Sequence, residues 1–329
     1  MGISYKDSGV DINAGEATVE RIKPLVKSTH NNNVLSNIGL FGGFYDASFP
    51  EYKHPILVAS TDGVGTKLKV AFAASKHNTI GQCLVNHCVN DILCCGAKPL
   101  FFLDYFATGV LNPDVTVQVI EGFVTACKQN DTALIGGETA EMPSMYHEGE
   151  YDVSGTIIGV VDKKNIVNGS DIQKGDILIG LKSTGLHTNG FSLARAVLFN
   201  KYKVDDYVDF LGETIGDALL KVHKSYLKPV LPLVESQILT GISHITGGGL
   251  IGNTKRILPK DRKLKIDWNS WEQLPIFELI QETGNVSDEE MRAAFNLGIG
   301  MVLITRKENA DKVFTGVKDY NPVFIGEIE

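Results

Sequence analysis

Four short apolar segments, each bounded by turn residues, recur in the first half of this 329-residue chain and constrain its fold most strongly. They are rich in branched and aromatic side chains, as β-strands are, and lie at residues 56–60, 100–106, 132–136 and 153–161. Helices are predicted around them at residues 14–28, 79–95 and 112–130. This alternation predicts a domain that mixes helices with a sheet.

Capping residues mark several of the predicted helix starts. Thr79 and Gln82 have the spacing of a capping box, and Ser287 and Glu290 repeat it. Asn112 followed by Pro113 indicates another start, because proline suits the first helical position.

A polar stretch at residues 162–175 separates this half from a second one. Beyond it we predict strands near residues 176–181, 242–245, 299–304 and 324–328, and helices from Gly190, within residues 215–234 and after a triple glycine. We therefore predict an α+β protein with two mixed α/β domains, residues 1–165 and 166–329.

Composition narrows the class of protein. Hydrophobic residues make up 43% and charged residues 21%, which indicates a globular chain rather than a disordered one. The net charge of -8 gives no general attraction to nucleic acid. No segment approaches the roughly 18 apolar residues of a membrane span, and residues 1–11 lack a hydrophobic signal region. We expect a cytoplasmic protein without nucleic-acid or membrane partners.

Five cysteines, four of them within thirteen positions, raise the question of a metal site; they are Cys83, Cys88, Cys94, Cys95 and Cys127. Cys83, His87 and Asp91 would share one helix face at four-residue spacing. However, there is no C-x-x-C motif, and free cysteine packs well as a small hydrophobe. We favour buried thiols over a zinc site.

The segment from Ser60 to Lys67 follows a predicted strand and is rich in glycine. Its Asp62 could hold a divalent cation at the strand end, and Thr66 and Lys67 could bind phosphate oxygens. The order Thr-Lys and the short glycine spacing exclude a Walker A loop. A plain Asp-Gly turn is the alternative for this segment taken alone.

Three further carboxylates lie within apolar segments or in a glycine turn. Asp91 follows Asn90 within an otherwise apolar helix, Asp104 lies within an apolar strand, and Glu138 follows the Gly136-Gly137 turn. An exposed helix face is an equally good explanation for Asn90 and Asp91 alone. Oxygen ligands from several elements, without histidine pairs, suit Mg²⁺ better than zinc. Together the turns predict a magnesium site that uses Asp62, Asp91 and Glu138.

Two turns of the second half could bind anions at helix starts. One contains His187, Thr188, Asn189 and Gly190; the other contains Thr246, Gly247, Gly248 and Gly249. Consecutive glycines can present several N–H donors to a phosphate. The alternatives are a structural histidine in the first turn and a mobile loop in the second.

Taken together, these motifs resemble the aminoimidazole ribonucleotide synthetase family over nearly the whole chain. The matching segments are residues 5–12, 61–67, 89–91, 99–105, 136–143, 187–190 and 246–249, with Phe295, Asn296, Gly298 and Gly300. Ser60, Thr188 and Ser144 depart from the family pattern by small-for-small exchanges, which affect loop geometry more than chemistry.

The resemblance implies a homodimer whose N-terminal strands form a barrel across the interface, with ATP bound nearby. It implies that ATP, with Mg²⁺, activates the formyl oxygen of formylglycinamidine ribonucleotide. A substrate nitrogen then attacks that carbon, which closes the imidazole ring and releases phosphate. Residues 5–12, with Lys23 and Lys27, are expected to close over ATP.

The resemblance also assigns site residues. The catalytic residues implied are Asp62, Lys67 and His187. The ATP-binding residues implied are Lys27, Gly63, Gly65, Thr66, Lys67, Asn90, Asp104, Gly136, Gly137 and Thr139. The substrate-binding residues implied are His187, Thr188, Asn189, Gly190, Thr246, Gly247, Gly248 and Gly249. The alternatives are another ATP-using member of the same superfamily or a catalytically inactive nucleotide-binding scaffold.

Overall fold

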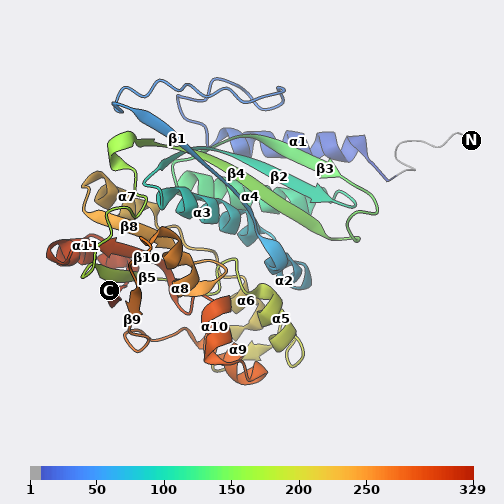
Figure 1. Cartoon of the computed structure of the whole chain (residues 1–329). Helices are drawn as coiled ribbons and strands as arrows, with labels where there is room; N and C mark the ends of the chain where they lie inside the picture. Colours follow the sequence, from blue (N-terminus) through green and yellow to red (C-terminus); the bar gives the residue numbers. More distant parts are fainter. Residues whose placement is uncertain (1–8) are drawn as a thin grey trace, which may run out of the picture.

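The computed structural model describes residues 9–329, which form two α+β parts, each built around one sheet (Figure 1). The first sheet contains β1 (Pro55–Gly63), β2 (Lys98–Thr108), β3 (Ala133–Glu141) and β4 (Tyr151–Asp162) in the order β1-β4-β2-β3. Strands β2 and β3 are parallel, whereas β4 runs antiparallel to both β1 and β2. The four predicted strands are confirmed and are longer than expected.

Helices cover one face of this sheet. α3 (Asn78–Leu93) and α4 (Pro113–Gln129) pack beneath it, and α1 (Ile12–Lys27) lies beside α4 and β3 (Figure 1). On the covered face, Phe102 and Ile157 are completely buried, while Leu57 on the opposite face is 62% exposed. Only one face of the sheet is therefore packed against helices of the described part of the chain.

The second sheet has the order β8-β10-β5-β11-β9, and every neighbouring pair in it is antiparallel. Its strands are β5 (Ile177–Lys182), β8 (Leu239–His244), β9 (Leu264–Ile266), β10 (Ile299–Thr305) and β11 (Pro322–Ile328). Its helices are α5 (Phe191–Leu198), α6 (Ile215–Leu219), α7 (Leu227–Glu235), α8 (Gly249–Thr254), α9 (Pro275–Gly284), α10 (Asp288–Ala294) and α11 (Ala310–Gly316). A hairpin of β6 (Tyr207–Val208) and β7 (Glu213–Thr214) and the short helix α2 (Leu68–Ala74) complete the regular elements.

Two of the three predicted helix starts are confirmed by their caps. The Asn112 side chain accepts from the N–H groups of Asp114 and Val115, and the Ser287 side chain accepts from Glu290. The capping box at Thr79 is wrong: α3 begins at Asn78, and the Gln82 amide donates to the Asn78 carbonyl instead of reaching back to a cap.

The helical segments expected within residues 215–234 are α6 and α7, and residues 220–226 separate them. The carbonyls of Lys221, His223 and Lys224 accept hydrogen bonds from side chains of the first half. Their partners come from tertiary structure, which a helix pattern does not contain.

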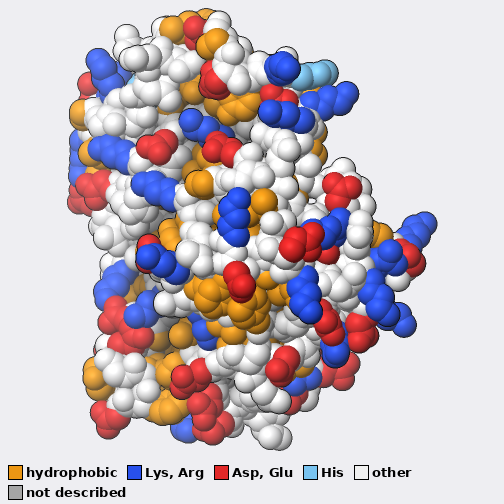
Figure 2. All heavy atoms as spheres, turned by 90° about the vertical axis from the view of Figure 1, so that its left-hand side faces the viewer, with side chains coloured by type: hydrophobic (Ala, Val, Ile, Leu, Met, Phe, Trp, Pro, Cys, Tyr) orange, Lys and Arg blue, Asp and Glu red, His pale blue; other side chains and the backbone are white. Residues whose placement is uncertain are grey.

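Two further observations concern the charge of the surface and the length and polarity of the helices. Basic and acidic side chains are interspersed on the face at the left of Figure 1 (Figure 2). Within residues 9–329, each helix is too short or too polar to cross a bilayer.

Gly155 in β4 tests the packing of the first sheet. A Cβ added there would lie 2.0 Å from Cζ of the buried Phe102 ring. We predict that Gly155→Ala lowers the free energy of unfolding by about 1–3 kcal/mol through overpacking, measured by urea denaturation. Gly15→Ala is the matched control, because nothing lies within 4 Å of its added Cβ and alanine favours a helix. Equal stability of Gly155→Ala and the control would contradict this packing.

Candidate functional site

The structure divides the predicted site residues between two cavities. The first, which we call the interdomain cavity, has a volume of about 430 Å³ and lies between β1 and α3 on one side and β8 and α8 on the other. Polar side chains that line it include Ser60, Asp62, His87, Asp91, His244, Thr246, Asn253 and Arg256. It thus brings together two of the predicted carboxylates with two histidines.

Asp62 ends β1 and faces α3. Its Oδ2 lies 2.9 Å from Nε2 of His87, and its Oδ1 accepts from the Gly63 N–H at 2.7 Å. Burial opposes its ionisation, but the hydrogen bond and charge of His87 outweigh burial and lower the pKa of Asp62. The carboxylate is therefore ionised at neutral pH and still 43% exposed, so it remains available to a cation.

Asp91 lies one helical turn after His87 on the same face of α3, and it contacts both domains. Its Oδ1 lies 2.8 Å from Nδ1 of His244, and its Oδ2 accepts from the Ser60 hydroxyl at 3.3 Å. Burial again opposes ionisation, but the hydrogen bond from His244 lowers the pKa of Asp91 overall. Two of the three carboxylates of the predicted metal site, Asp62 and Asp91, thus line this cavity.

A cluster of four histidines, which sequence reasoning missed apart from His87 and His187, lies behind these carboxylates. The rings of His187 and His223 stack with centroids 4.0 Å apart, and His244 and His87 lie 5.0 and 5.2 Å from His223. Burial lowers the pKa of His187 and of His223 well below the ordinary value. Both rings are therefore neutral at pH 7.

The second cavity, which we call the sheet-edge cavity, has a volume of about 730 Å³ and lies between α1, β2, β3 and residues 37–43. It is lined by four of the predicted nucleotide-binding residues, Asp104, Gly136, Gly137 and Thr139, and by the predicted metal ligand Glu138. Removal from water raises the pKa of Asp104 to about 7, and the nearby Glu138 charge adds to the effect. Asp104 is thus partly protonated at neutral pH.

Glu138 does not join Asp62 and Asp91 within one chain, which corrects the predicted set of three metal ligands. Asp62 on β1 and Gly137 on β3 lie on one row of the sheet, with Gly155 and Asp104 between them. Three strand spacings of about 4.8 Å place them roughly 14 Å apart. One ion cannot bridge that distance.

Lys67 also departs from its predicted role, because it is completely buried. Its ammonium donates to the carbonyls of His187 and Lys221, at 2.8 and 2.7 Å, and contacts Sγ of Cys83 at 3.2 Å. All three N–H donors therefore have protein partners. We revise its role from phosphate binding to holding the two domains together.

The turn that contains His187 is built into the interior rather than into the cavity wall. His187 has a φ of 63° and is 1% exposed, and its Nε2 accepts from the Thr184 N–H at 3.3 Å. Thr188 is buried as well, whereas Asn189 and Gly190 are half-buried. Direct contact of His187 or Thr188 with substrate does not fit this geometry.

In the glycine turn, some of the backbone N–H groups already donate hydrogen bonds to carbonyls of the same chain. The N–H groups of Gly248 and Gly249 donate to the carbonyls of Ala293 and Thr246, so they are not a free set of donors as predicted. Gly248, with a φ of 97°, is exposed, as is Gly247. A Cβ on Gly247 would lie 3.5 Å from Nδ2 of Asn189, so the two predicted anion-binding turns are neighbours.

The remaining predicted residues lie apart from both cavities or at their borders. Lys27 is exposed at the end of α1, and the Thr66 hydroxyl contacts the Ser192 hydroxyl at 3.0 Å. Gly63 closes β1, and Gly65 has a φ of 67° in the turn that follows. The part of the predicted ATP-closing segment formed by residues 5–8 lies outside the described residues.

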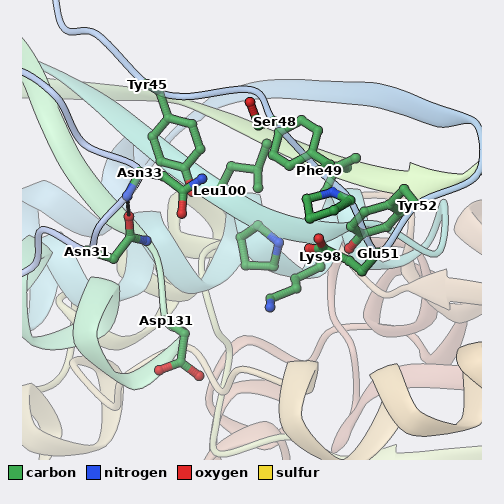
Figure 3. Close-up of a pocket in the computed structure, with 13 residues that line it drawn as sticks. Asn31, Asn33, Tyr45, Ser48, Phe49, Glu51, Tyr52, Lys98, Leu100 and Asp131 are labelled. Atoms are coloured by element: carbon green, nitrogen blue, oxygen red, sulfur yellow. Dashed lines mark hydrogen bonds between the residues drawn. The ribbon is translucent and has the colours of Figure 1, made fainter.

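Two cysteines, Cys94 and Cys95, also line the interdomain cavity, whereas a third cavity holds none of the predicted site residues. Cys83, Cys88 and Cys127 are buried, as expected, but Cys94 is half-buried and Cys95 is exposed. The third cavity, of about 360 Å³, lies under the segment that contains Tyr45 and Tyr52 (Figure 3). Its lining residues are all different from the predicted site residues.

Comparison with known proteins shows which family the chain belongs to. Residues 48–161 match the N-terminal domain of AIR synthase related proteins, and residues 173–329 match the C-terminal domain of that family. A phosphoribosylformylglycinamidine cyclo-ligase of Alkaliphilus oremlandii is 50% identical over 313 residues, which cover 94% of this chain and 92% of the relative. The chain belongs to the phosphoribosylformylglycinamidine cyclo-ligase family. The family resemblance is thereby confirmed.

Solved structures support the fold. A thiamine-monophosphate kinase from Stenotrophomonas maltophilia superposes with a TM-score of 0.72 at 17% identity and covers 94% of this chain and 93% of its own. The hydrogenase maturation protein HypE in complex with ATP gives a TM-score of 0.68 at 15% identity, over 98% and 87%. At this identity the likeness concerns the fold alone.

The revised role of Lys67 is testable. We predict that Lys67→Met lowers the free energy of unfolding by about 2–4 kcal/mol, because two buried carbonyls lose their donor. Lys69→Met is the matched control: Lys69 pairs with Glu150 at the surface, so we expect a loss below about 1 kcal/mol. Chemical denaturation followed by circular dichroism measures both. A Lys67 variant as stable as the control would restore a functional rather than a structural role.

Proposed function

We infer that this protein closes formylglycinamidine ribonucleotide to 5-aminoimidazole ribonucleotide with ATP, releasing ADP and phosphate, in de novo purine biosynthesis. The observation that carries this inference is the 50% identity to a cyclo-ligase over nearly the full length of both chains. The enzyme is therefore an ATP-dependent ligase that forms a carbon–nitrogen bond. Its place of action is proposed to be the cytoplasm.

Asp62 and Asp91 are proposed to hold the Mg²⁺ that accompanies ATP. Phosphoryl transfer depends on positioning and charge neutralisation more than on a protein nucleophile, and Mg²⁺ is usually held by one or two carboxylates. Both side chains are ionised, partly exposed and directed into the interdomain cavity. These residues fit the ion, which would neutralise phosphate charge there.

The two parts of the chain are proposed to divide the substrates, with nucleotide on residues 1–165 and ribonucleotide on residues 166–329. The sheet-edge cavity supports the first assignment, because its Gly136–Gly137 backbone is accessible and Asp104 and Thr139 can accept or donate hydrogen bonds. The adjoining turns at Asn189 and Gly247 support the second, because they place an amide beside exposed backbone.

A homodimer is proposed to complete the nucleotide site. The face of the first sheet opposite α3 carries the 62%-exposed Leu57, and Leu40, Phe41 and Phe44 are also exposed. Apolar exposure of this kind is typical of an interface. Joining two such sheets into a barrel would let carboxylates that one chain holds apart act on the same nucleotide.

Asp62 tests the catalytic assignment. We predict that Asp62→Asn lowers formation of aminoimidazole ribonucleotide by about 100-fold or more, because the amide is a weaker ligand for the Mg²⁺ that would neutralise the reacting phosphate. The measurement is ADP release with and without formylglycinamidine ribonucleotide. Asp205→Asn, at an exposed position away from both cavities, is the control and should keep full activity. Normal activity and normal Mg²⁺ dependence of Asp62→Asn would remove Asp62 from the site.

The dimer is tested by light scattering. We predict a mass of twice 35.8 kDa for the unchanged chain and a shift toward the monomer for Leu57→Lys, since a charge would enter the apolar interface. Ile166→Lys, at a 39%-exposed apolar position between β4 and β5 in the chain, should leave the mass unchanged. A fully active monomer would contradict the shared barrel.

A further inference from the structure

We infer that His87, Asp91 and His244 form a binding site for a first-row transition metal dication of the zinc class, in addition to the Mg²⁺ that accompanies ATP. Oxygen ligands without histidine pairs favoured Mg²⁺ in the sequence. The fold, however, brings a histidine pair together from α3 and β8, 157 positions apart. The site requires neither nucleotide nor ribonucleotide, so it can be tested independently of the proposed reaction.

The donor atoms are close enough for one ion. One ligand atom each from His87, Asp91 and His244 lie within 4.8 Å of one another. Nε2 of His87 is 3.8 Å from Oδ2 of Asp91, and Nδ1 of His244 is 2.8 Å from Oδ1 of Asp91. Ligands bound at about 2.1 Å from an ion stand at most about 4.2 Å apart, so small side-chain rotations complete the site.

Hydrogen bonds behind the site fix the position of the His223 ring. The Asn90 side-chain oxygen accepts from the Tyr226 N–H at 3.0 Å, which fixes the orientation of this amide. Its NH₂ group therefore donates to the Lys224 carbonyl and to Nε2 of His223, at 2.9 and 3.1 Å.

The His223 ring in turn contacts His244, whose other nitrogen faces a carboxylate. Nε2 of His244 lies 2.9 Å from Nε2 of His223. Nδ1 of His244 lies 2.8 Å from Oδ1 of Asp91. A cation bound at these two atoms would take the place of the hydrogen bond between them.

Both histidines are held in the orientation that metal binding requires. The second nitrogen of each ring has a partner: Nδ1 of His87 contacts the Thr188 hydroxyl at 2.5 Å, and Nε2 of His244 contacts His223. Such second contacts fix the orientation of a ligating imidazole. The nitrogens left for an ion are the ones that face the interdomain cavity, which also offers open coordination positions.

The donor set selects the class of ion. Imidazole nitrogen suits zinc, iron, nickel and copper, whereas Mg²⁺ prefers carboxylate and water oxygen. Asp62, with Oδ2 at 2.9 Å from Nε2 of His87, can act as a further ligand or hold a neighbouring Mg²⁺. Asp91 has one oxygen near each histidine, so it can serve both ions.

The test uses Co²⁺ as a visible substitute for Zn²⁺, added to metal-stripped full-length protein without nucleotide. We expect one Co²⁺ per chain with a visible absorption band, and Zn²⁺ should displace it, whereas a large excess of Mg²⁺ should not. His244→Gln should weaken Co²⁺ binding by about 10-fold or more. His147→Gln, which removes an exposed histidine, is the matched control and should bind as the unchanged chain does.

His87→Gln serves as a second variant in case His244→Gln does not fold, with circular dichroism as the check. Displacement of Co²⁺ by stoichiometric Mg²⁺ would mean a carboxylate site only. Absence of a visible band would mean that no such ion binds, and unchanged binding in both folded histidine variants would mean that the ion binds away from these histidines. Each of these results would overturn the proposal.

Discussion

The arrangement of the whole molecule depends on the polar side of α3. Asn86 and Asn90 on this helix are buried, and their amides form hydrogen bonds with the backbone of residues 223–226. A buried amide without a partner costs about 1–3 kcal/mol. Displacing the second domain would leave both amides unpaired, so these contacts hold the domain in place. The same contacts keep residues 220–226 out of a helix and set His223 beside its three neighbours.

The position of α3 is in turn set by a close approach to α4. A Cβ on Gly81 would lie 2.3 Å from the Val119 carbonyl, and one on Gly122 would lie 2.6 Å from the Asn78 carbonyl. Glycine at both positions lets the two helices touch through their backbones. Because the functional side chains of α3 lie on its other faces, this contact determines how far His87 and Asp91 reach beneath β1.

The consequence for chemistry is a boundary between neutral and charged groups. His187 and His223 are buried and neutral, and the Lys67 ammonium is occupied by two carbonyls and Cys83. The interior side of the cluster therefore holds no free charge for a substrate. Asp62 and Asp91 stand at the cavity side and remain ionised. The carboxylates that could hold a phosphate-neutralising cation therefore lie on the side that ligands can reach.

Local patterns in the sequence were enough for the strands of both sheets except β9, for the caps at Asn112 and Ser287 and for the family, because alternation, capping and short motifs act over a few residues. The same patterns identified Asp62 and Asp91 as candidate metal ligands. They could not show that Lys67 is interior, that Glu138 lies three strands away or that His244 faces Asp91. The position of Glu138 depends on the strand order of the first sheet. The positions of Lys67 and His244 depend on contacts between residues more than a hundred positions apart, which only the packing of the two domains on α3 decides.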